Sequence, residues 1–221
     1  MVSSGFVVLG DVVHSRKISD DRRVQELLLE VCREVNRKFK GQILADFRIL
    51  KGIDEIGGVL REGEGILEIV QMFWERLYPV TLRLAVVYGK IDVGVETRDI
   101  SLMSGPAIIR ASQSIEALKK ADLVFHLEVS DPVVDQALSG FMNALFLIQQ
   151  GWTPRERRVF QLQRRLKNQR SVAQRLGITQ QAVSKILSRI HWRAVLALEH
   201  QAQSLFQKVV QTREVSHVPV G

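Results

Sequence analysis

Three carboxylates in the first quarter of the chain stand where they could bind a hard cation. Asp11 directly follows a short apolar run, and Asp54 and Glu55 lie at a turn between two segments rich in strand-forming residues. Carboxylate oxygens are the ligands that Mg²⁺ and Ca²⁺ prefer. Asp11, Asp54 and Glu55 are therefore candidate metal ligands, although aspartate is also common in turns that bind nothing.

Basic and hydroxyl side chains lie close to these acids in the sequence. Positive charge and backbone N–H groups at the start of a segment favour an anion. The candidate ligand-binding residues are Ser15, Arg16, Lys17 and Lys51. Acids and bases together predict a phosphate-bearing ligand, with Mg²⁺ and a nucleotide as the expected cofactor.

A second group of residues, in the segment 171–190, has the spacing of a helix-turn-helix. Ala173 is small enough for two helices to pack closely, and Gly177, four residues later, suits the positive φ of a tight turn. Thr179 can cap the second helix. The outward face of that helix carries polar side chains suited to base edges and phosphates in a DNA major groove, namely Gln180, Gln181, Ser184, Lys185 and Ser188.

Arginines within this segment and on either side of it are candidates for phosphate contacts. Such contacts position a protein on DNA without specifying sequence. They are Arg155, Arg158, Arg164, Arg165, Arg170, Arg175, Arg189 and Arg193. The chain carries a formal net charge of +7, whereas residues 152–193 alone carry +10. A basic segment beside a mildly acidic one favours a nucleic-acid partner, and a solvated basic face or a basic protein-docking module is the alternative.

The apolar periodicity along the chain predicts the elements that must position these residues. Strands are expected at 6–9, 43–50, 55–61, 80–88 and 123–129, with a short one between Gly89 and Gly94. Helices are expected at 20–40, 65–78, 102–120, 132–149, 153–166, 171–190 (as two helices) and 194–210. This order predicts an α+β fold, a ferredoxin-like sandwich, followed by an all-α helix-turn-helix domain.

Three segments are expected as domains: 1–150 as the ferredoxin-like domain, 151–193 as the DNA-binding domain, and 194–221 as a C-terminal helix and tail. Thr153, Pro154 and Glu156 mark a strong helix start at the first boundary, since threonine and glutamate at this spacing form a capping box. Cys32, the one cysteine, excludes an intrachain disulfide and is interpreted as a packing residue.

Several motifs resemble those of the SatD family. They are Gly10-Asp11-Val12-Val13-His14-Ser15-Arg16-Lys17, then Asp54-Glu55-Ile56-Gly57-Gly58-Val59-Leu60, then Ser104-Gly105-Pro106-Ala107. In the family's Gly-Asp-Glu-Phe-Gln motif, Ile53 here replaces the glycine, and Ile56 and Gly57 replace Phe and Gln. The segment 153–192 resembles the helix-turn-helix of sigma-factor region 4.

More distantly, the layout is similar to the palm-like core of class III nucleotide cyclases and GGDEF domains. That resemblance implies two metal-binding acids about where Asp11 and Asp54 or Glu55 fall. It also implies an Asn and an Arg on a later helix, where Ile109 and Gln113 stand here. The position of the cation that stabilises the transition state in cyclases therefore holds no charged residue here. Arg110, nearby in the sequence, is the candidate substitute. Catalysis is accordingly not the favoured hypothesis.

The favoured hypothesis is a DNA-binding transcriptional regulator that binds double-stranded DNA as a homodimer. Its N-terminal domain senses a metal-nucleotide or another phosphate ligand, or only mediates self-association. The alternative is an enzyme, a divergent Mg²⁺-dependent nucleotidyl cyclase or phosphoryl-transfer catalyst. The sequence lacks an apolar run long enough to span a bilayer and a signal-peptide pattern, so a cytoplasmic protein without a membrane partner is expected.

Overall fold

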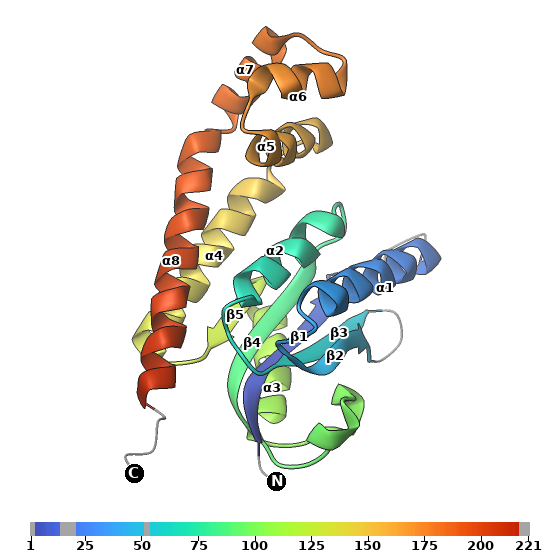
Figure 1. Cartoon of the computed structure of the whole chain (residues 1–221), viewed down its shortest axis with the longest axis vertical. Coiled ribbons are helices and arrows are strands. Elements are labelled where there is room, and N and C mark those ends of the chain that lie inside the picture. The colour runs from blue at the N-terminus through green and yellow to red at the C-terminus, as the bar shows by residue number, and fades with distance from the viewer. Residues whose placement is uncertain (1–2, 14–20, 51–53, 217–221) are drawn as a thin grey trace. The chain divides into compact units, whose positions relative to one another are not determined.

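The computed structural model describes residues 3–13, 21–50 and 54–216 (Figure 1). The chain divides into two compact units. The N-terminal unit consists of Met1–Gly140 and Phe206–Gly221, and the helical unit consists of Phe141–Leu205. The divisions fall inside two long helices, whereas the expected domain boundaries lay at 150/151 and 193/194.

The N-terminal unit is built on a five-stranded sheet with the order β2-β3-β1-β4-β5. The central strand β1 pairs antiparallel with both of its neighbours, β2 pairs antiparallel with β3, and β5 pairs parallel with β4. The strands are β1 (Ser3–Val12), β2 (Ile43–Ile49), β3 (Glu55–Leu60), β4 (Leu82–Ile91) and β5 (Phe125–Glu128). The fold is therefore a mixed α+β one, as the periodicity predicted.

Helices cover both faces of this sheet (Figure 1). They are α1 (Asp21–Lys38), α2 (Ile66–Arg76) and α3 (Pro106–Ala121), joined by the first part of α4 (Pro132–Gln150) and the last part of α8 (Trp192–Ser216). Because the sheet has helices on both sides, β1 is buried along most of its length. Alternate β1 residues Val7 and Leu9 share a core cluster with Ala107, Ala111 and Ile115 of α3.

The end of α8 belongs to the N-terminal unit because it buries apolar side chains there. Phe206 and Val210 are buried. A Cβ atom added to Gly63 would lie 2.7 Å from the Val210 side chain. The expected final helix, 194–210, therefore extends at both ends, to Trp192 and Ser216.

The prediction of a separate short strand between Gly89 and Gly94 is wrong. Strand β4 continues through Gly89 to Ile91, and two 3-10 helices follow, η2 (Val95–Thr97) and η3 (Ile100–Leu102). Gly89 does not end the strand. It makes room for the Arg110 side chain, whose Nη2 would lie 2.6 Å from an added Cβ.

The helical unit contains three short helices, α5 (Pro154–Leu166), α6 (Gln169–Leu176) and α7 (Gln180–Arg189), with the adjoining parts of α4 and α8. The expected capping box at Thr153 and Glu156 is present, and the Thr179 side chain caps α7 by accepting from the backbone N–H of Ala182. Gly177 takes φ 65°, ψ 33° at the end of α6. Among the described residues, none of the helices combines the length and apolar character that crossing a bilayer requires.

Candidate functional site

One row of charged residues crosses the three central strands of the sheet, at the end of β1 and the starts of β3 and β4. Asp11 on β1 is the register partner of Glu55 on β3 and of Arg83 on β4. Asp11 and Glu55, two of the acids singled out in the sequence, therefore lie side by side. Asp54 precedes β3, and its backbone carbonyl accepts a hydrogen bond from the Val12 N–H at 2.8 Å.

The Asp11 carboxylate is balanced by two cations of its own chain. Lys119 Nζ on α3 lies 3.0 Å from Asp11 Oδ1, and Arg83 Nη1 lies 3.7 Å from Asp11 Oδ2. The same lysine lies 3.0 Å from Glu116. Partial burial works to lower the pKa of Lys119, but its hydrogen bonds to Asp11 and Glu116 outweigh burial, so the pKa is raised. Lys119 therefore stays charged beside the Asp11 carboxylate.

This arrangement does not fit a divalent metal site. A metal ion needs several carboxylates whose charge is not already neutralised, and Asp11 has two cationic partners. Within the ranges 3–13, 21–50 and 54–216, no three His, Cys, Asp or Glu side chains are grouped so that they could hold a metal ion. Ser15, Arg16, Lys17 and Lys51, the expected phosphate ligands, lie outside the described residues.

A cavity of about 390 Å³ opens beside the charged row. Its walls come from β1, β3, the end of β2, η3 and one face of α3. Aliphatic side chains dominate the lining, and carboxylates are the charged groups in it. The lining residues are Leu9, Gly10, Asp11, Leu50, Glu55, Ile56, Ile100, Ser101, Ile108, Ser112, Ile115 and Glu116.

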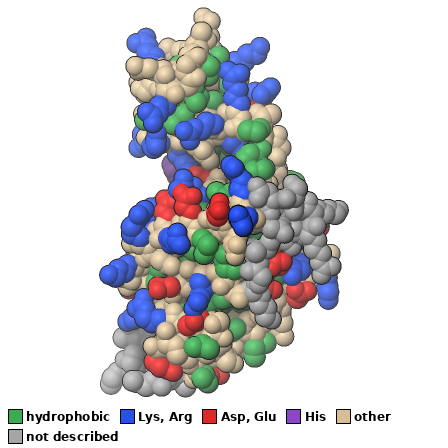
Figure 2. Space-filling model, turned by 90° about the vertical axis from the view of Figure 1, so that its right-hand side faces the viewer, with side chains coloured by type: hydrophobic (Ala, Val, Ile, Leu, Met, Phe, Trp, Pro, Cys, Tyr) green, Lys and Arg blue, Asp and Glu red, His purple; other side chains and the backbone are tan. Residues whose placement is uncertain are grey.

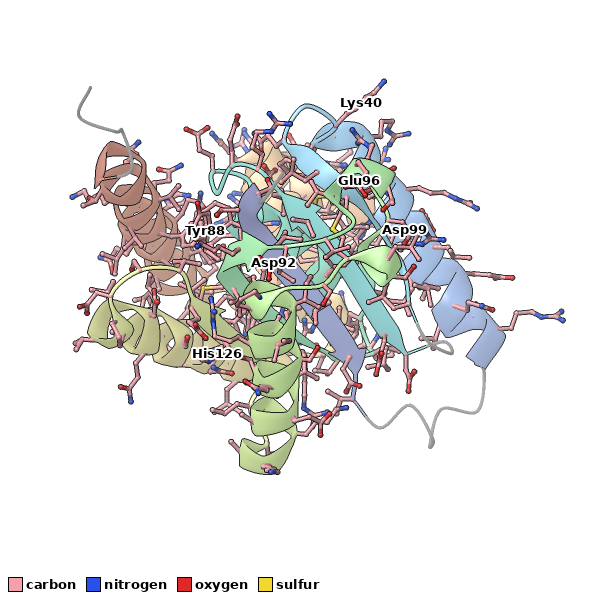
Figure 3. All side chains as sticks on the ribbon, turned by 90° about the horizontal axis from the view of Figure 1, so that it is seen from below. Lys40, Tyr88, Asp92, Glu96, Asp99 and His126 are labelled. Carbon is pink, nitrogen blue, oxygen red and sulfur yellow. The ribbon has the colours of Figure 1, made fainter. Side chains whose placement is uncertain are left out.

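The connection between β4 and α3 supplies one wall of this cavity through η3. Figure 3 shows this connection, with Asp92, Glu96 and Asp99 labelled along it. The Asp99 side chain caps η3 by accepting from the Ser101 N–H at 3.0 Å and forms an ion pair with Arg48. Hydrogen bonds from Ser101, more than the pairing with Arg48, lower the pKa of Asp99.

Arg110, the expected substitute for a cyclase transition-state cation, is engaged elsewhere. Its Nη2 donates to the Tyr88 carbonyl at 2.9 Å, and its Nε donates to Glu128. Ile109 and Gln113 are both exposed. The cations at Asp11 are instead Lys119 and Arg83, which sequence reasoning missed. For Lys119 the helical spacing offered a signal, because Ser112, Ile115, Glu116 and Lys119 stand at positions i, i+3, i+4 and i+7 and so share one face of a helix.

The second candidate site is the outward face of α7 in the helical unit. Val183 and Leu187 are buried against α5 and α6. The side chains expected to contact DNA are all exposed, namely Thr179, Gln180, Gln181, Ser184, Lys185, Ser188 and Arg189. A shallow hollow of about 560 Å³ runs along this face between Gln181 and His191.

Cationic side chains surround this face. Figure 2 shows Lys and Arg side chains spread over the helical unit, at the top of the view, with few acids among them. The exposed arginines are Arg155, Arg158, Arg165, Arg170, Arg175, Arg189 and Arg193. Arg164, also proposed as a phosphate contact, instead lies 3.5 Å from Glu199 and stacks over the Phe160 ring.

Glu156, the lone acid of the basic segment, ties two helices of this unit together. Its buried carboxylate accepts from the Thr153 N–H at 2.8 Å and from the Thr153 hydroxyl at 2.7 Å. Arg189 Nε, at the end of α7, lies 2.7 Å from its other oxygen. Burial works to raise the pKa of Glu156, but the bonds from Thr153 and Arg189 prevail, so the pKa is lowered. Glu156 therefore joins the start of α5 to the end of α7.

Comparison with solved structures finds distant matches. Two solved structures of a bacterial light-regulated adenylyl cyclase align with 10% and 8% identity and TM-scores of 0.42 and 0.41. Each alignment covers 57% of this chain and 43% of the cyclase chain, so less than half of those proteins is matched. At these scores the likeness supports no argument about fold or activity.

No curated protein matches the chain in sequence. The sequence model of the SatD family, however, matches residues 6–206, which include both candidate sites and nearly all of the described residues. The chain therefore belongs to the SatD family.

Proposed function

We propose that this protein is a DNA-binding regulator in which α6, the Gly177 turn and α7 act as a helix-turn-helix. The observation that carries the proposal is the exposed polar face of α7, bordered by exposed arginines within a segment of net charge +10. Phosphates attract such a surface regardless of sequence, and short polar side chains on the inserted helix discriminate bases. Thr179 and Asn168 support it by capping α7 and α6.

We further propose that the N-terminal unit is a ferredoxin-like sensor domain. Support comes from the strand order β2-β3-β1-β4 and from the antiparallel pairing of these four strands. The cavity beside Asp11 is of a size typical of small-ligand sites. We expect a homodimer, since helix-turn-helix proteins commonly bind two half-sites. The geometry does not favour the cyclase alternative. The Asp11 carboxylate is neutralised by Lys119 and Arg83. Arg110 is bound to Tyr88 and Glu128.

The DNA proposal is tested by measuring how the protein binds pooled genomic DNA duplexes. Fluorescence anisotropy is the readout, first at low salt and then at rising salt concentrations. The double variant Lys185→Glu, Ser188→Glu should weaken binding at least about 10-fold, because it places two carboxylates on the face that would meet the phosphates. The control is Lys120→Glu, Gln113→Glu, which makes the same change in net charge at exposed positions of α3. The control should bind within about 2-fold of the unaltered protein.

Two results would contradict the proposal. One is an unaltered protein that binds no duplex even at low salt. The other is an equal loss of binding in both double variants, since that would trace the interaction to net charge and not to α7.

A further inference from the structure

Two side chains of the helical unit meet across the turn between α6 and α7. Arg170 lies in the first turn of α6, and Gln180 is the first residue of α7. Arg170 Nε donates a hydrogen bond to Gln180 Oε1 at 3.3 Å. Both side chains are exposed, on the rim of the face proposed to meet DNA.

The backbone around both residues is held by caps. The Asn168 side chain accepts from the N–H groups of Arg170 and Ser171, at 2.9 and 3.1 Å. The Thr179 hydroxyl accepts from the Ala182 N–H at 3.1 Å. Each partner is therefore within two residues of a capped helix start, so the backbone at both positions is held in place.

This contact changes what Gln180 can offer to a base. A glutamine side chain has one acceptor oxygen and one donor NH₂ group, and that pair matches the N7 acceptor and N6 donor of adenine. A guanidinium group only donates, so the atom of Gln180 that faces Arg170 must be its oxygen. The remaining lone pair of that oxygen lies beside the guanidinium cation. The amino group of adenine, itself a donor, would therefore meet the N–H donors of Arg170 there.

We infer that the Arg170–Gln180 pair selects guanine at the base that the first residue of α7 contacts. With the glutamine oxygen engaged, the pair presents the Gln180 NH₂ group and the guanidinium, which are all donors. Guanine offers two acceptors, N7 and O6, in the major groove, and adenine offers one acceptor and one donor. Arg170 both orients the Gln180 amide and adds donors of its own toward guanine, and the inference rests on the proposed DNA-binding function.

The experiment is a selection of bound duplexes from a randomised pool by the full-length protein, read by sequencing. The variants are Arg170→Ala and Gln180→Ala, with Arg175→Ala as the matched control. Arg175 is also exposed and cationic on α6, but it borders a different hollow, with Arg165 and Gln174.

The unaltered protein should prefer guanine over adenine at one position of each half-site. Arg170→Ala should shift that ratio toward adenine by about 10-fold, the scale of one bidentate base contact. Gln180→Ala should erase the preference at the same position only. Arg175→Ala should weaken binding overall and leave every base preference unchanged.

Failure of the inference and failure of the proposed function give different results. If the unaltered protein binds DNA and Arg170→Ala keeps the same base ratio at every position, the inference is overturned while the proposed function stands. An unaltered protein that enriches no duplex at all overturns both.

Discussion

At the scale of single residues, two of the buried carboxylates, Asp11 and Glu156, have different kinds of partner. Asp11 lies between two cations from other elements, Arg83 of β4 and Lys119 of α3. Glu156 combines a local helix cap with one distant arginine. In both cases a buried charge is tolerated because it is paired and hydrogen-bonded.

Replacement of Asp11 by Asn should destabilise the N-terminal unit by about 3 kcal/mol, because Arg83, itself buried, loses a charged partner. Amide hydrogen exchange in β1 and β4 measures this loss. Asp46→Asn is the control, since Asp46 pairs with Arg98 at 3.4 Å with both side chains more than half exposed. The control should change stability by less than about 0.5 kcal/mol. A variant Asp11→Asn that is as stable as the unaltered protein would mean that the acids of this row repel one another, as they do in an empty metal site.

Glu156 should make the stability of the helical unit depend on pH. Its pKa in the folded protein lies below the ordinary glutamate value of 4.5, so the ionised form stabilises the fold. This contribution is complete above that ordinary value and is lost as the pH falls through the lower, folded-state pKa. The difference in melting temperature between the unaltered protein and Glu156→Gln should be largest near pH 7 and should shrink below about pH 4.5. A difference that stays constant from pH 7 to pH 3 would show that Glu156 acts as a neutral cap.

At the scale of elements, the turn between α6 and α7 depends on backbone conformation more than on packing. Gly177 has φ 65°, and a Cβ atom added there would meet no atom within 4 Å. The cost of a side chain at this position is therefore the cost of the left-handed conformation alone.

Gly177→Ala should lower the stability of the helical unit by about 1 kcal/mol, and Gly177→Asn by less, because asparagine tolerates this region better. Exchange protection of α6 and α7 amides reports the change. Gly151→Ala is the control, since its added Cβ would make only an ordinary 3.5 Å contact and its φ is not in the left-handed region. Equal losses for Ala and Asn at position 177 would show that space, and not φ, limits this turn.

At the scale of the whole molecule, charge is distributed unequally along the chain. Residues 152–193 carry a net +10 in a protein whose total is +7. Such a distribution directs any polyanion to one segment, and its effect must fall as salt screens it.

The logarithm of the DNA association constant should therefore fall linearly with the logarithm of salt concentration. Arg158→Ala, which removes an exposed charge from α5, should reduce the slope by about one, as the loss of one phosphate contact would. Lys120→Ala, an equal charge change on α3, should leave the slope unaltered. The same slope in all three proteins would place the polyanion away from the helical unit.

What the sequence determined by itself is the local structure. Most strands and helices were predicted to within a few residues, because apolar periodicity depends on near neighbours; the separate strand between Gly89 and Gly94 and the end of the last helix were not. The capping box at Thr153 and the left-handed Gly177 were predicted for the same reason, since a helix end is decided within about four residues. The convergence of Asp11 with the acids of the hairpin was a hypothesis from the sequence, and it is the pairing of β1 with β3 that places Asp11 beside Glu55.

Only the tertiary structure decided which charges neutralise one another and where the units divide. Lys119 and Arg83 lie 108 and 72 positions from Asp11 in the sequence, and nothing local links them. The role of Gly89 depends on Arg110 arriving from α3, so the sequence alone suggested a strand end instead. The second division falls inside α8 because Phe206 and Val210 are buried in the N-terminal unit. Each of these outcomes is a contact between segments far apart in the chain, and such contacts exist only after the elements have packed.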